Sequence, residues 1–356
     1  MVGARPQFVK LAPVAAECAR RGVEHTIVHS GQHYDANLSD VFFDDLHIPT
    51  PDVHLGVGSG SHGQQTGAIL AGLDEVLATQ RPDWVMVYGD TNTTLAAALS
   101  AAKLHLPLAH LEAGLRSFNR AMPEEINRVL TDHAADLLLA PSQVAIEHLR
   151  REGLVQRAVH VGDVMVDILM ATRDIAARRQ THASGEQPAA LGHAPGTYSI
   201  ATIHRAENTD DPARLRAIVE SLAAIDHPVI LLAHPRLVQR AGRHSISLQL
   251  GSLDVRAPLS YPDLIAAVTG SRGVVTDSGG LQKEAFVLRV PCTTVRTETE
   301  WVETFEAEWN VLVEPGPGLV SAASRPTPMP TPSAPYGAGH AAAAVLDSLI
   351  AGGTPR

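Results

Sequence analysis

Short apolar runs alternate with segments of high helix propensity along the chain. An apolar run at 84–89 precedes an Ala-rich segment at 95–103, and another apolar run follows at 107–111. The apolar runs predict buried strands, and the segment between them predicts a helix. Successive parallel strands need such a crossover, so the pattern predicts an α/β fold with parallel sheets.

The same alternation continues on both sides of this unit. We expect further strands at 23–29, 136–140, 160–161, 198–203, 228–233, 273–276 and 291–295. Further helices are expected at 11–20, 41–46, 64–80, 122–133, 144–152, 212–224 and 339–349. The Pro-, Ser- and Thr-rich stretch at 316–335 is expected to be irregular. Almost no strand precedes the first helix, so either the sheet lost an element or the start codon is placed late.

The length of 356 residues suggests two domains. From 178 to 197 the sequence turns to Gln, His, Ser, Gly, Pro and Ala, the one clear break of composition in the middle of the chain. Such a stretch is typical of a linker. We therefore expect a first domain at 1–178, a linker at 179–197 and a second domain at 198–337.

Composition excludes several classes of protein. The formal net charge of −10 leaves no basic surface for nucleic acid, although arginines and helix N-termini can still bind an anion locally. No apolar run is long enough to span a bilayer, and no leader-like segment opens the chain. The two cysteines lack metal-ligand spacing. A cytoplasmic protein without nucleic-acid or membrane partners is expected.

Carboxylates follow two neighbouring predicted strands. Asp90 follows the first, and Glu112 follows the second 22 positions later. The carboxyl ends of parallel strands share one edge of the sheet, where open α/β sheets bind ligands. Glu124, in the first turn of the next predicted helix, would return to the same edge. The simpler alternatives are that Asp90 only caps a helix and that Glu124 only pairs with Arg128.

The start of the chain resembles a phosphate-binding turn. Gly3 and Pro6 lie where a strand would turn into a helix, and Arg5 and Lys10 would add positive charge there. The alternative is an ordinary solvated pair of basic residues. The glycines at 58, 60 and 63 also satisfy a dinucleotide-binding pattern, but the preceding segment is too short and polar for a core strand. We interpret those glycines as a flexible loop.

A second anion site is predicted after the apolar run at 273–276. Ser278 can cap the following helix, and Gly279 and Gly280 leave backbone N–H groups open to an anion. Glu284, about two turns into the helix, could reach ribose hydroxyls. A plain capped helix would explain Ser278 but explains the two glycines less well.

Eight short motifs follow one another in order along nearly the whole chain, at 3–6, 31–33, 89–93, 112–116, 123–128, 204–208, 277–280 and 335–337. Their sequences are Gly-Ala-Arg-Pro, Gly-Gln-His, Gly-Asp-Thr-Asn-Thr, Glu-Ala-Gly-Leu-Arg, Pro-Glu-Glu-Ile-Asn-Arg, His-Arg-Ala-Glu-Asn, Asp-Ser-Gly-Gly and Pro-Tyr-Gly. Together they resemble the non-hydrolysing UDP-N-acetylglucosamine 2-epimerases. Any single segment would be a weak signal, whereas the ordered set is specific.

The resemblance implies a fold and a reaction. The fold would be two Rossmann-like domains facing a cleft, as in GT-B glycosyltransferases, with the C-terminal helix at 338–352 crossing back to the first domain. The reaction would invert carbon 2 of a UDP-N-acetylhexosamine by elimination of UDP, formation of a 2-acetamidoglucal and re-addition. Carboxylates would stabilise positive charge and move protons. No metal or cofactor is implied, and a homodimer is expected.

The resemblance also assigns roles to residues. Asp90, Glu112 and Glu124 are the candidate acid–base groups, without a choice of which one takes the carbon-2 proton. His204 would stabilise or protonate the departing diphosphate. The expected UDP-sugar contacts are Arg5, Lys10, Arg128, Ser278, Gly279, Gly280 and Glu284.

Some positions depart from the usual pattern. Gln64 stands where an arginine is expected in enzymes regulated by their own substrate, which puts allosteric control in doubt. The segments 6–8 and 299–301 resemble the branch that acts on modified hexosamines, such as UDP-2,3-diacetamido glucuronic acid. Other possible activities are a hydrolysing epimerase that releases free N-acetylmannosamine, a glycosyltransferase, and a nucleotide-sugar sensor without turnover.

Overall fold

The computed structural model describes residues 1–31, 49–182 and 191–352, without the side chains of residues 5, 6 and 176–182. The helix expected at 41–46 lies outside these residues. Internal contacts divide the chain into two compact units. Unit 1 comprises Met1–Ile168 with Ala334–Arg356, and unit 2 comprises Leu169–Ser333. The domain and linker boundaries expected from the composition stay a prediction.

Unit 1 holds a four-stranded parallel sheet in the order β3-β4-β5-β6 and a two-stranded parallel sheet, β1-β2. Val2 links the two sheets, because it pairs with His29 of β1 while the Met1 amino group donates to the Met86 carbonyl of β3 at 2.9 Å. The strand ahead of the first helix is therefore reduced to one bridge. The strands are β1 (Val28–His29), β2 (Val53–His54), β3 (Val85–Tyr88), β4 (Leu108–Leu111), β5 (Leu137–Ala140) and β6 (Ala158–His160).

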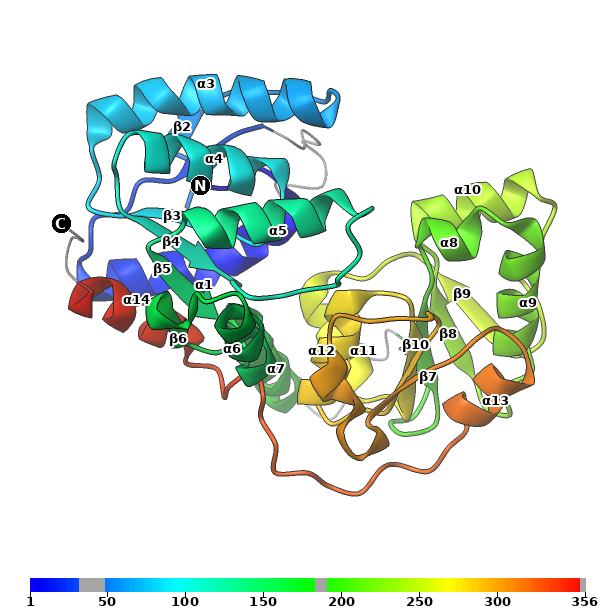
Figure 1. Cartoon of the computed structure of the whole chain (residues 1–356). Coiled ribbons are helices and arrows are strands. Elements are labelled where there is room, and N and C mark those ends of the chain that lie inside the picture. Colours follow the sequence, from blue (N-terminus) through cyan, green and yellow to red (C-terminus); the bar gives the residue numbers. More distant parts are fainter. Residues whose placement is uncertain (32–48, 183–190, 353–356) are drawn as a thin grey trace. The chain divides into compact units, whose positions relative to one another are not determined.

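Helices cover both faces of this sheet (Figure 1). On one side lie α3, α4 and α5, and on the other lie α1 and α14. Fully buried alanines of α4, among them Ala97 and Ala101, pack into a core with Leu73 of α3 and Val87 of β3. The helices of unit 1 are α1 (Arg5–Arg21), α3 (His62–Gln80), α4 (Asn92–Lys103), α5 (Pro123–Ala134), α6 (Gln143–Arg151), η1 (Val155–Arg157), α7 (Val164–His182), which continues into unit 2, and α14 (Ala341–Ala351).

The C-terminal helix α14 returns to unit 1 and packs against α1. Arg21 of α1 pairs with Asp347 of α14 at 2.5 Å. The Asp167 carboxylate accepts hydrogen bonds from the backbone N–H groups of Ala341 and Ala342, at 2.9 and 2.8 Å, and so caps the first turn of α14. The predicted return of the last helix to the first unit is confirmed.

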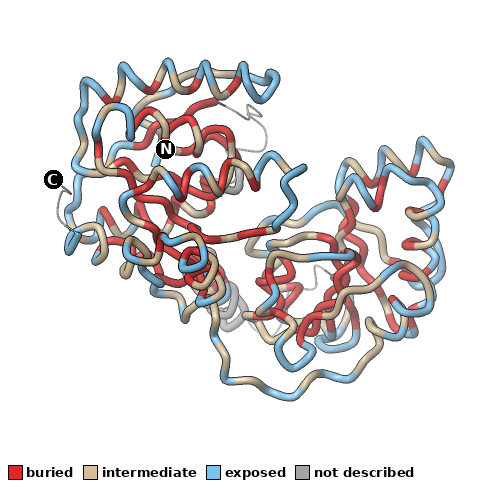
Figure 2. The backbone as a smooth tube through the Cα atoms, in the orientation of Figure 1, coloured by how far each residue is buried: buried red, intermediate tan, exposed pale blue. Residues whose placement is uncertain are grey.

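Unit 2 is built on one six-stranded parallel sheet in the order β12-β11-β10-β7-β8-β9. Successive strand residues point to opposite faces, so Ile200 and Val274 enter a core with α11 and α12, whereas Ala201 and Val275 enter a core with α9, α10 and α13. The central strands β7, β8, β10 and β11 are almost fully buried, whereas the edge strands β9 and β12 are mostly intermediate (Figure 2). The strands are β7 (Ser199–Thr202), β8 (Val229–Leu232), β9 (Leu253–Arg256), β10 (Gly273–Thr276), β11 (Cys292–Thr294) and β12 (Asn310–Leu312). The helices are α8 (Ala206–Thr209), α9 (Pro212–Ala223), α10 (Pro235–Arg243), α11 (Tyr261–Thr269), α12 (Gly279–Val287), η3 (Val302–Glu308) and α13 (Pro317–Ala323).

The prediction of two α/β units with parallel sheets is confirmed, and two expected elements differ. The strand expected at 23–29 is only Val28–His29. On one side it pairs with the two residues of β2, and on the other side it pairs with Val2 alone. The stretch expected to be irregular at 316–335 begins with α13, which starts at Pro317 and buries Leu319. Within the described residues, no helix has the length and apolarity needed to cross a bilayer.

Candidate active site

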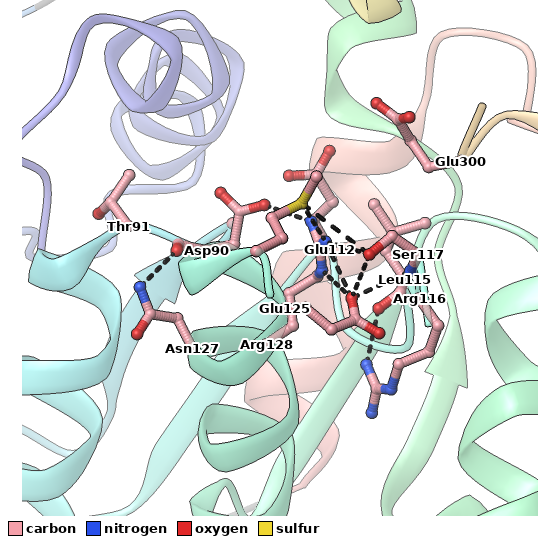
Figure 3. A network of polar contacts seen from close by, with 12 residues as sticks. Asp90, Thr91, Glu112, Leu115, Arg116, Ser117, Glu125, Asn127, Arg128 and Glu300 are labelled. Carbon is pink, nitrogen blue, oxygen red and sulfur yellow. Dashed lines mark hydrogen bonds and ion pairs between the residues drawn. The ribbon is translucent and has the colours of Figure 1, made fainter. Parts of the chain in front are cut away.

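Two carboxylates lie at the same edge of the unit 1 sheet. Tyr88 of β3 pairs in register with Leu111 of β4, so Asp90 and Glu112 follow the strands at nearly the same level (Figure 3). Thr91, not Asp90, caps α4, since the Thr91 hydroxyl accepts from the Thr94 N–H at 3.4 Å. The interpretation of Asp90 as a mere helix cap is therefore wrong.

Lys10 of α1 reaches the same edge. Its ammonium group donates to Glu112, and both groups lie over Gly89, where an added Cβ would come within 3.2 Å of the Glu112 Oε2 and the Lys10 Nζ. Burial lowers the pKa of Lys10, but Glu112 and Asp90 raise it more, so the net pKa is raised. A cation therefore contacts Glu112 and interacts electrostatically with Asp90.

Helix α5 holds Asp90 from the other side. Arg128 pairs with the Asp90 carboxylate at 2.6 Å and with Glu125 at 2.9 Å, and the Asn127 side chain donates to the Asp90 backbone carbonyl at 2.9 Å (Figure 3). Arg128 thus has two carboxylate partners other than Glu124, the partner suggested by its spacing. Glu124 itself is exposed at the start of α5.

Asp90 has the electrostatics of a proton-transfer group. Burial is the largest influence and raises its pKa; Lys10 and Arg128 lower the pKa, whereas Glu112 and Glu124 raise it, and the net pKa is raised. Its side chain is still 33% exposed, so a ligand can reach it. A carboxyl group that titrates closer to neutrality can both take and return a proton.

In unit 2 the polar residues gather where the strand order reverses. β7 and β10 are neighbours, yet their chains continue to opposite edges of the sheet, which makes their carboxyl ends the topological switch point. His204 follows β7 and Asp277 follows β10. The fully buried Asp277 carboxylate lies 3.0 Å from the His204 Nδ1 and accepts from the backbone N–H groups of His204 and Arg205. With Nδ1 bound, Nε2 is the ring nitrogen left for a ligand.

The predicted anion site after β10 is the N-terminus of α12. Ser278 accepts from the Leu281 N–H at 3.4 Å, so it is a helix cap as the simpler alternative proposed. At Gly279 an added Cβ would come within 2.8 Å of a Glu300 carboxylate oxygen and 3.2 Å of the Trp301 Nε1, so these side chains would have to shift. The buried Glu284 accepts from the Tyr261 hydroxyl at 3.0 Å.

The Asp277 contacts lead to a prediction about stability. Burial raises the pKa of Asp277, but the His204 contact, then Asn208 and the Arg205 N–H, lower it below its usual value. Asp277→Asn is expected to lower the free energy of unfolding at neutral pH by about 1–3 kcal/mol, because an amide cannot accept from all these donors. A depressed pKa stabilises the fold above the unfolded pKa of about 3.9 and loses that effect as the pH falls through the folded pKa.

Urea unfolding of both proteins across the acid range measures this effect. The difference between wild type and Asp277→Asn should shrink below about pH 4. Asp226→Asn, at an exposed aspartate that also contacts a histidine, is the control and should change little. A difference between wild type and Asp277→Asn that does not depend on pH would contradict the prediction.

The sequence-based prediction missed part of this arrangement. Asp277 belongs to the quoted Asp-Ser-Gly-Gly segment, and its position directly after a strand was the available signal. Asn127 and Glu125 belong to the quoted Pro-Glu-Glu-Ile-Asn-Arg segment, but their contacts with Asp90 and Arg128 could not be inferred from it. The Arg5 side chain, with Gln32 and His33, lies outside the described part of the chain. The Gln7 side chain accepts from the Gly3 and Ala4 N–H groups at 2.8 and 3.0 Å, which occupies donors of the expected phosphate-binding turn.

Comparison with known proteins gives consistent results. Residues 16–350 match the protein family described as UDP-N-acetylglucosamine 2-epimerase. A UDP-2,3-diacetamido-2,3-dideoxy-D-glucuronate 2-epimerase of Pseudomonas aeruginosa is 47% identical over 320 residues, covering 88% of this chain and 87% of the relative. A UDP-N-acetylglucosamine 2-epimerase homolog of Methanococcus maripaludis is 45% identical over 316 residues, with the same coverage of each chain. The crystal structure of Methanocaldococcus jannaschii UDP-GlcNAc 2-epimerase with UDP-GlcNAc and UDP matches with a TM-score of 0.85 and 36% identity over 98% of both chains.

Proposed function

Because the chain belongs to the UDP-N-acetylglucosamine 2-epimerase family, we propose that it inverts carbon 2 of UDP-N-acetylglucosamine or of an analogue with further substituents. The enzyme is an isomerase. The observation that carries the acid–base assignment is Asp90, a reachable carboxyl group with a raised pKa, set between Lys10 and Arg128 and close to Glu112.

The carbon-2 proton is not acidic enough to be removed directly, so the leaving group must depart first or in concert. In the proposed reaction the bond between carbon 1 and the diphosphate oxygen breaks, and its electron pair leaves with UDP. The carbon-2 proton passes to a carboxylate, and a double bond forms between carbons 1 and 2. UDP then adds back to the 2-acetamidoglucal while a proton returns to the opposite face of carbon 2, which gives the epimer.

The unit 1 carboxylates serve this chemistry in two ways. Asp90 and Glu112, with Glu124, would stabilise positive charge at carbon 1 and carry protons to and from carbon 2. The positive charges of Lys10 and Arg128 lower the pKa of Asp90 and so oppose the effect of the neighbouring carboxylates. Lys10 and Arg128 would also contact the UDP-sugar.

Unit 2 supplies the UDP-binding groups. A switch point is the usual ligand site of an open α/β sheet, and the N-terminus of α12 favours negative charge there. His204, oriented by Asp277, would donate from Nε2 to the departing diphosphate. Ser278, Gly279 and Gly280 would place backbone N–H groups near phosphate oxygens. Glu284 would accept from ribose hydroxyls, and Arg5 would add positive charge.

Turnover of UDP-N-acetylglucosamine in heavy water tests the reaction. NMR and mass spectrometry should find UDP-N-acetylmannosamine with one solvent deuterium at carbon 2. Product without deuterium would contradict the elimination, and free N-acetylmannosamine would identify a hydrolysing enzyme. The same assay on UDP-2,3-diacetamido-2,3-dideoxy-glucuronate tests the modified substrate, which the 47% identical relative supports. A homodimer is likewise proposed, and sedimentation of the purified chain tests it.

A further inference from the structure

A cluster of buried ionisable side chains contacts the backbone next to the two carboxylates of unit 1. It consists of His110 in β4, Asp132 in α5 and Arg116 in the loop after β4, with side chains that are 0–1% exposed. Arg116 also pairs with the partly exposed Glu152 at 2.8 Å. None of these residues belongs to the acid–base or UDP-binding groups described above. Charges are rarely buried so completely without a reason, because their removal from water is costly.

Both nitrogens of the His110 ring face acceptors. Nε2 lies 2.7 Å from the Gly89 backbone carbonyl, and Nδ1 lies 2.6 Å from the Asp132 carboxylate. A carbonyl oxygen can only accept, so Nε2 must carry a hydrogen.

Asp132 is surrounded by donors. Its second oxygen accepts from the Gly114 N–H at 3.0 Å and lies 2.7 Å from the Arg116 guanidinium. Burial raises the pKa of Asp132, but His110 and then Arg116 lower it more, and the net pKa is lowered. Asp132 thus contacts His110, Gly114 and Arg116 at once and fixes these three groups relative to one another.

The cluster joins the backbone on both sides of the site. His110 holds the carbonyl of Gly89, the residue directly before Asp90, and Asp132 holds the N–H of Gly114, two residues after Glu112. Glu112 has a φ of 75° and Gly114 a φ of 82°. Only glycine fits at position 114, because a Cβ would lie 2.5 Å from the Ala145 carbonyl oxygen. A loop with a non-glycine residue at positive φ needs such support.

We propose that the His110–Asp132–Arg116 cluster is a positioning device for the reaction, in which the hydrogen bonds of His110 and Asp132 tie the Asp90 and Glu112 loops together. The proposal rests on the proposed function for its effect on turnover. The cluster does not contact a reacting atom. It fixes two carboxylates relative to each other, and misplacement of reacting groups by about 1 Å can cost roughly 10²-fold in rate.

The kinetic test is His110→Gln. A Gln side chain cannot replace both ring contacts at once, so kcat should fall by about 10- to 100-fold. The KM for the UDP-sugar and the Kd for UDP should stay unchanged, because His110 touches neither. The control is His227→Gln in unit 2, since His227 is also buried with its Nδ1 on an aspartate, Asp226, at 2.9 Å. Equal kcat values for the two variants would overturn the proposal.

A second measurement needs no turnover. In protein labelled with ¹⁵N-histidine, the His110 signals are those lost in His110→Gln. The Nε2 atom of His110 should carry a proton, because the Gly89 carbonyl that it faces can only accept. A bare Nε2 would overturn the proposal even if His110→Gln failed to fold. If the wild type turned over no UDP-sugar, the proposed function would fail, while the protonation of His110 would still be measured on the same sample.

Discussion

Replacing Asp90 by Asn should lower kcat by about 10²- to 10⁴-fold while the Kd for UDP stays near that of the wild type. The amide has nearly the same shape and can still accept from Arg128, so the variant removes proton transfer more than structure. The raised pKa of Asp90 also leads us to expect a specific pH dependence of kcat/KM. If Asp90 must be ionised to take the proton, kcat/KM of the wild type falls on the acid side of a pKa above the usual value for aspartate, and this limb is absent in Asp90→Asn.

The same β-strand provides a matched control for Asp90. Asp83 is exposed before the amino end of β3, whereas Asp90 follows its carboxyl end. Asp83→Asn should keep wild-type kcat and the same pH profile. Measurement of kcat, KM and UDP binding for the two variants separates chemistry from folding. If Asp90→Asn turned over as fast as Asp83→Asn, Asp90 could not be an acid–base group.

Replacing His204 by Asn should lower kcat by about 10²- to 10³-fold, the usual loss when one donor to a developing negative charge is removed. The departing diphosphate gains charge as the bond to carbon 1 breaks, and the His204 Nε2 is the ring atom left to stabilise it. Asn keeps a short polar side chain near Asp277 but cannot deliver a donor to the same position. The loss should be in kcat and not in KM, because this charge develops only in the transition state.

His193→Asn is the control for His204→Asn. His193 also contacts an aspartate, Asp254 at 3.2 Å, but it precedes β7 while His204 follows it. His193→Asn should therefore keep the wild-type kcat. A rise in KM with unchanged kcat in His204→Asn would assign His204 to uniform substrate binding and remove it from the chemical step.

Several features of the fold follow from local patterns. Strands such as β8 and β10, buried on both faces, need continuous apolar runs, and those runs are visible in the sequence. The pairing that limits a strand is not local. The apolar residues before Val28 do not extend β1, because the neighbouring strand β2 and Val2 provide too few partners. The helix at Pro317 was missed because the burial of Leu319 depends on unit 2 as a whole.

The sequence by itself determined the alternation of strands and helices, and with it the edge of the sheet to which Asp90 and Glu112 belong. Connection lengths and apolar runs are sufficient for that inference, because parallel topology places every strand end on a definite side. Only the tertiary structure decided which charges meet: Arg128 with Asp90, His204 with Asp277, and His110 with Asp132. These pairs join residues far apart in the chain, and their geometry depends on how helices and strands pack, which local propensity does not encode.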